Sequence, residues 1–134
     1  MNDQDTAPRN NQSQNLSQSQ SHGQKPTFDV YEVAREICRG LRPLLPRIAK
    51  VDRDLVKHLR ESGRSVSLNV AEGNRRTGGD RLYHFKVAAG SADEVQAGLH
   101  NAEDFGYVRA EELRSLYALL DRELAMLWRL THPR

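Results

Sequence analysis

Four basic side chains near the middle of the chain follow one another at steps of four, three and four: Arg53, Lys57, Arg60 and Arg64. On an α-helix these steps place all four side chains on one face. Such a row suits a nucleic-acid backbone, because cations that contact phosphates release condensed counterions, and a guanidinium group donates in a forked geometry. The row is followed by four further cations that could extend it: Arg75, Arg76, Arg81 and Lys86. These eight residues are the predicted nucleic-acid-binding site.

The distribution of charge along the chain supports this prediction. The formal net charge is only +2, but residues 39–86 contain twelve basic and five acidic side chains, a local charge of +7. Two alternatives remain open: a solvated helix face paired with nearby acids, or a surface for an acidic protein partner. The neighbouring acids are Asp52, Asp54, Glu61 and Asp80. No helix-turn-helix, zinc finger or aromatic stacking module is evident, so base-specific recognition is not predicted.

Apolar residues recur at steps of three and four, which predicts four amphipathic helices near residues 28–42, 50–74, 77–105 and 109–131. Thr77 and Asp80 have the spacing of a capping box for the third helix, and Gly73-Asn74 suits a left-handed helix end. The fourth helix has the clearest apolar seam: Leu113, Leu116, Tyr117, Leu120, Leu124, Leu127 and Leu130. Short connections between these helices predict an all-α, antiparallel up-down-up-down four-helix bundle over 28–134.

Residues 1–27 are rich in Gln, Asn and Ser, and Leu16 is almost their only large apolar residue. Such a segment buries too little surface to offset the entropy of ordering, so we predict a disordered tail. It lacks the pattern of an export signal, and no later segment is apolar for long enough to span a membrane. The single cysteine, Cys38, excludes an intramolecular disulfide framework. We therefore expect a cytoplasmic protein.

Three motifs resemble the signature of a known family. Residues 65–73 read S-V-S-L-N-V-A-E-G, residues 85–95 read F-K-V-A-A-G-S-A-D-E-V, and residues 106–108 read G-Y-V, with Arg76-Thr77 between the first two. The chain is similar, over about residues 28–131, to the bacterial four-helix bundle family first described from 23S ribosomal RNA intervening sequences, often labelled S23. The sequence departs from the pattern in having valine for isoleucine, Thr77 for serine, and Ala88 for a bulkier aliphatic residue.

The resemblance implies a ring-shaped homopentamer with a basic face and no enzymatic activity. A related group serves as accessory proteins to the reverse transcriptases of diversity-generating retroelements and binds both nucleic acid and the polymerase. The leading hypothesis is therefore a non-enzymatic, oligomeric bundle that binds RNA or DNA through its basic surface. The alternative is a protein-binding scaffold or accessory subunit, for example for a retroelement reverse transcriptase.

Two carboxylates in the matching motifs, Glu72 and Glu94, are accompanied by Asn69 and Ser91. The two acids could form a general acid–base pair. We favour a structural polar network in which they bridge helices or pair with an arginine such as Arg76. A helix-bundle di-iron site would need Glu-x-x-His motifs, and none is present. We therefore predict no catalytic residue, no metal and no cofactor.

Overall fold

The computed structural model describes the chain from Pro26 to Pro133, and its side chains from Asp29 onward. All of its regular elements are helices: α2 (Pro26–Leu41), α3 (Leu45–Ala49), α4 (Arg53–Arg75), α5 (Gly78–Asp104) and α6 (Ala110–Thr131). The predicted all-α class is therefore confirmed for the described residues. The predicted tail over residues 1–27 lies outside them, apart from Pro26 and Thr27, which begin α2.

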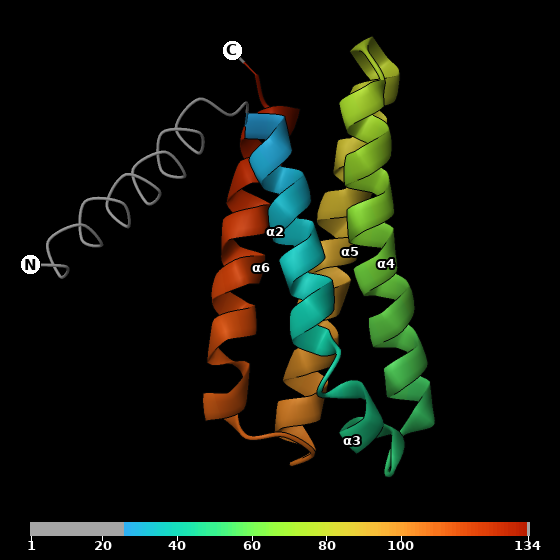
Figure 1. Ribbon diagram of the computed structural model, residues 1–134, viewed down its shortest axis with the longest axis vertical. Coiled ribbons are helices and arrows are strands. Elements are labelled where there is room, and N and C mark those ends of the chain that lie inside the picture. Colours follow the sequence, from blue (N-terminus) through green and yellow to red (C-terminus); the bar gives the residue numbers. More distant parts are fainter. Residues whose placement is uncertain (1–25, 134) are drawn as a thin grey trace, which may run out of the picture.

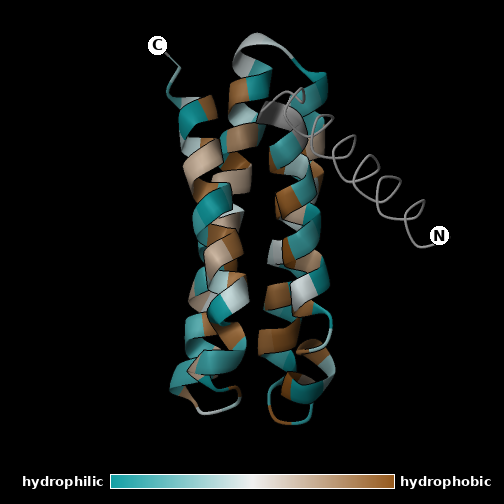
Figure 2. Ribbon diagram, turned by 60° about the vertical axis from the view of Figure 1, so that its left-hand side comes forward, coloured by the Kyte–Doolittle hydropathy of each residue, from teal (hydrophilic) through white to brown (hydrophobic). Residues whose placement is uncertain are grey.

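The four long helices pack side by side (Figure 1). α2 contacts α4 and α6, and α5 contacts the same two helices. In Figure 1 the chain descends along α2, ascends along α4, descends along α5 and ascends along α6. Figure 2 shows apolar and polar residues alternating in bands along each helix, as expected when one stripe of each helix faces a shared core. None of the described helices has the length and apolar character to cross a lipid bilayer.

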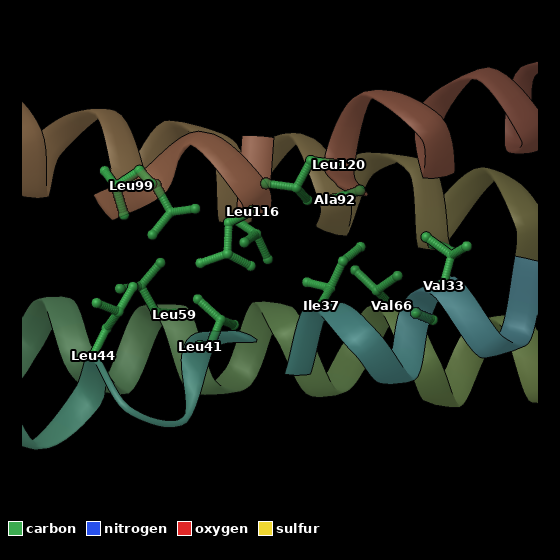
Figure 3. Close-up of a cluster of buried hydrophobic side chains, with 14 of the residues drawn as sticks. Val33, Ile37, Leu41, Leu44, Leu59, Val66, Ala92, Leu99, Leu116 and Leu120 are labelled. Carbon is green, nitrogen blue, oxygen red and sulfur yellow. The ribbon is translucent and has the colours of Figure 1, made fainter. Parts of the chain in front are cut away.

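The core is a cluster of mostly aliphatic side chains to which all four long helices contribute (Figure 3). Residues of α4 that face the core are buried: Leu55, Leu59, Ser62, Val66, Val70 and Gly73. Val51 precedes α4, and its side chain is 62% exposed. The residue after it, Asp52, caps α4 by accepting a 2.9 Å hydrogen bond from the Leu55 amide. α4 thus begins later than the periodicity predicted.

The predicted capping features between α4 and α5 are not formed. Thr77 precedes α5 but makes no side-chain cap hydrogen bond. The Asp80 carboxylate instead lies 3.5 Å from the Arg76 guanidinium. α4 continues through Gly73 and Asn74 to Arg75, and among the described residues only Gly78 and Gly106 have positive φ. The left-handed backbone therefore occurs at Gly78, at the start of the next helix.

The short helix α3 was not predicted. It forms because Pro46 lies in its first turn, where a missing amide donor costs nothing. Arg47 on α3 makes a two-pronged ion pair with Glu112 on α6, at 2.7 and 3.2 Å. The hydrogen bond from Arg47 lowers the pKa of Glu112 to about 2. Arg47 is one of the twelve basic residues between positions 39 and 86, and its charge is consequently paired within the fold.

Candidate functional site

The four cations of the predicted row lie exposed on one face of α4: Arg53, Lys57, Arg60 and Arg64. None of them forms an ion pair with any residue that the structure describes. The neighbouring acids that could have neutralised these cations either interact with other groups or form no ion pair within the described chain. Asp52 caps α4 and Asp80 contacts Arg76, while Asp54 and Glu61 are exposed and form no ion pair within the described chain. We call these four cations the α4 row.

Of the four additional predicted cations, Arg75 continues the α4 row. It lies eleven residues beyond Arg64, which is close to three helical turns, and it is exposed. Lys86 is exposed on α5. The remaining two have partners within the fold and are not free for phosphate.

Arg76 binds Glu72 at 3.1 Å and Asp80 at 3.5 Å, so two carboxylates neutralise its charge. Arg81 donates to the Gly73 carbonyl at 3.1 Å, and its guanidinium lies 4.7 Å from the centre of the Phe85 ring. Phe85 is completely buried. Arg81 therefore helps to join α4 to α5, and its place in the predicted binding site is corrected to a structural one.

Two arginines that sequence reasoning missed stand next to the α4 row. Arg39 on α2 and Arg42 in the turn after α2 line a cavity of about 530 Å³ together with Arg60. The packing of α2 against α4 brings them there. Both lie within residues 39–86, and the net charge of +7 over that range is the sequence feature that could have pointed to them. Their helix was read only for its apolar positions, so their closeness to Arg60 was not foreseen.

The predicted polar network is formed in part. The Ser65 and Ser91 hydroxyls lie 2.7 Å apart and join α4 to α5. Asn69 donates to the Ser65 carbonyl at 2.9 Å, and its carbonyl oxygen lies 3.0 Å from His84 Nδ1. Asn69 and Ser91 thus meet as expected, through Ser65, and His84 is an additional member.

The two predicted acids of the network lie outside it. Glu72 pairs with Arg76, the residue that follows the end of α4, and this is the arginine pairing that was predicted for it. Glu94 is exposed, and its backbone carbonyl oxygen lies 3.3 Å from His58 Nε2. Glu72 follows Ser65 by seven residues on α4, so it shares that helix face but lies about 10 Å further along the helix. The two carboxylates are not brought together as a pair.

A third carboxylate, Glu123 on α6, was not predicted as a site residue. Its side chain has 0% exposure, and neither carboxylate oxygen has a hydrogen-bond partner among the described residues. Burial raises the pKa of Glu123 to about 8, with the nearby Arg122 charge acting in the opposite direction. The sequence does contain a signal for this burial. Leu116, Leu120, Glu123 and Leu127 follow at steps of four, three and four along the apolar seam of the fourth helix. Glu123 takes a position that the periodicity assigns to the core.

The described part of the chain contains no group of three or more His, Cys, Asp or Glu side chains placed to hold a metal ion. Cys38 is half-buried, and its thiol donates to the Gly63 carbonyl at 3.4 Å. Cys38 also lines the cavity to which Arg39, Arg42 and Arg60 contribute. The site is thus a basic surface beside an apolar groove.

Comparisons with known proteins found one matching protein family and a similar solved structure. No curated protein matches it significantly in sequence. A solved structure is similar: the 1.70 Å crystal structure of a protein of unknown function from the S23 ribosomal protein family of Bacteroides thetaiotaomicron. The two share a TM-score of 0.74 at 16% identity, over 80% of this chain and 98% of that one. A likeness at this identity concerns the fold. The model of the 23S rRNA-intervening sequence protein family matches residues 27–129, and the chain therefore belongs to that family.

Proposed function

We propose that this protein is a non-enzymatic, cytoplasmic, antiparallel four-helix bundle that binds the phosphate backbone of nucleic acid through the α4 row. The observation that carries the proposal is the row itself: four exposed cations on one helix face without an ion pair in the described chain. The family name refers to an intervening sequence of 23S rRNA, which favours RNA as the first ligand to test.

The spacing of the row matches a polyanion in scale. Arg53 and Arg64 are eleven residues apart, which is about 16 Å along a helix. One strand of a duplex carries about five phosphates over that length, at about 3.4 Å each. Four cations can therefore each engage a different phosphate. Because none is occupied by a carboxylate of the described chain, no ion pair within the fold has to break before binding.

The test is a salt titration. We expect anisotropy of a labelled RNA or DNA to show affinity falling with a log–log slope of about −2.8 for a single strand to −3.6 for a duplex, as four phosphate contacts require. The double variant Arg60→Glu/Arg64→Glu should weaken binding roughly tenfold or more and flatten the slope. The matched control is Arg114→Glu/Arg129→Glu, two exposed arginines of α6, which should leave both quantities nearly unchanged. Binding that ignores salt, or equal losses in both variants, would contradict the proposal.

Self-association is the second part of the proposal. Large apolar side chains are exposed on three of the long helices: Leu68 on α4, Tyr83 on α5 and Trp128 on α6. Exposed apolar surface of this kind commonly marks contacts between proteins. We expect light scattering to give a multiple of the 15.2 kDa chain mass, five being the multiple that the family resemblance implies. A monomer mass at micromolar concentration would contradict this part.

The alternative function, a protein-binding accessory subunit such as one for a reverse transcriptase, would use the same basic surface. It predicts capture of an acidic partner that Arg60→Glu/Arg64→Glu abolishes. The groove beside the α4 row favours this alternative, because it offers apolar contact to a protein partner in addition to charge.

A further inference from the structure

A groove runs beside the α4 row, between α2, α3 and α4. It consists of two neighbouring hollows of about 530 and 210 Å³, both lined by Cys38, Leu45 and Arg60. The rest of its lining is mostly apolar: Leu41, Pro46, Ala49, Val56 and Gly63. Along α4 the lining reaches from Val56 to Ser67, eleven residues or about 16 Å. Its length corresponds to about three turns of helix.

Both rims of this groove are cationic. One rim has Arg39 on α2 and Arg42 in the turn after it, and α4 contributes Arg60 and Arg64. None of the four makes an ion pair with a residue in the described range. Like charges on opposite sides of an apolar groove repel one another, and a ligand with negative charge on both flanks would relieve that repulsion. The groove thus favours an occupant with an apolar underside and acidic sides.

We propose that this groove binds an acidic amphipathic helix of a partner protein. Such a helix places apolar side chains at steps of three and four on its underside, where the floor can bury them, and acids on its flanks, where the two rims can pair with them. A nucleic-acid strand would satisfy the rims alone, since no aromatic ring lines the groove for a base to stack on. This inference uses two rim residues of the α4 row but does not depend on nucleic-acid binding.

The groove can be blocked without changing its charge. Ala49 lines the larger hollow and is half-buried, so Ala49→Trp fills it with an indole ring. The probe is a labelled synthetic peptide of about 16 residues with Leu on one helical face and Glu elsewhere. We expect Ala49→Trp to weaken its binding roughly tenfold or more, measured by anisotropy. The matched control, Ala118→Trp at an exposed position of α6, should bind the peptide normally.

A second measurement needs no variant. Cys38 is the chain's single cysteine and it lines both hollows, so its alkylation by iodoacetamide reports whether the groove is filled. Saturating peptide should slow alkylation roughly tenfold or more. A peptide of the same composition, shuffled so that its Leu residues share no face, should not slow it. This measurement remains decisive if Ala49→Trp fails to fold.

The outcomes separate this inference from the proposed function. Peptide binding that Ala49→Trp removes, with oligonucleotide binding changed by no more than about twofold, supports the helix site as a distinct one. Equal binding of the ordered and shuffled peptides would overturn it, as would alkylation of Cys38 that the peptide leaves unchanged. If the oligonucleotide instead protects Cys38 and loses affinity in Ala49→Trp, the groove belongs to nucleic acid and the helix proposal fails. Loss of salt-dependent oligonucleotide binding alone would leave the helix site standing.

Discussion

Glu123→Leu is expected to stabilise the protein, and the gain should be about 4 kcal/mol larger at about pH 8 than at about pH 4. The carboxyl group is fully buried without a hydrogen-bond partner in the described chain, and burial raises its pKa from 4.5 to about 8. Below the unfolded value the group is protonated in both states. As pH rises toward the folded value, only the unfolded chain releases the proton, so stability falls across this window. Leucine removes both the proton linkage and the buried polar group.

Two variants isolate the cause. Glu123→Gln keeps a polar group of the same shape, so it should abolish the pH dependence without giving the full gain of leucine. Glu111→Gln, at an exposed position near the start of α6, should change little at either pH. The measurement is urea unfolding of each variant at several pH values, and the quantity compared is the free energy of unfolding relative to the original chain. A difference between the original chain and Glu123→Gln that stays constant with pH would refute the argument.

Gly73→Ala is expected to lower the free energy of unfolding by about 2 to 3 kcal/mol. A Cβ atom at this position would lie 2.5 Å from Cε1 and 2.6 Å from Cδ1 of the buried Phe85 ring. The ring has little freedom to move, because Phe85 is fully buried and Arg81 packs on it. Separation of α4 from α5 would also stretch the bond from Arg81 to the Gly73 carbonyl. The overpacking cost exceeds the roughly 1 kcal/mol by which alanine favours a helix interior.

Gly90→Ala is the matched control for this prediction. Gly90 lies within α5, but it is exposed and a Cβ atom there would have nothing within 4 Å. Helix propensity alone should then raise stability by about 0.5 to 1 kcal/mol. Thermal or urea unfolding of both variants should therefore shift in opposite directions. A stabilising effect of both substitutions would show that α4 and α5 do not meet as closely as the structure has them.

The α4 row was foreseen because it depends on one helix only. Once residues 53–75 are helical, steps of three and four place Arg53, Lys57, Arg60 and Arg64 together regardless of the rest of the fold. The same reasoning failed for Arg76 and Arg81, because each forms contacts around the turn between two helices. Charge and spacing identify a candidate cation, but they do not show whether a carboxylate, a carbonyl or a ring already occupies it.

Local periodicity was thus sufficient for the all-α class, for most helix limits, for the apolar seam of α6 and for the exposed cations of α4. Tertiary packing decided which arginines face one another across the groove, since Arg39 and Arg42 reach Arg60 only because α2 lies against α4. It also decided the state of Glu123, whose seam position becomes a buried site only when neighbouring helices cover it. The physical reason is range: a helix is specified by residues within about four positions of each other. Buried positions, ion pairs between helices and grooves are formed by residues far apart in the chain. They therefore exist only once the helices have packed together.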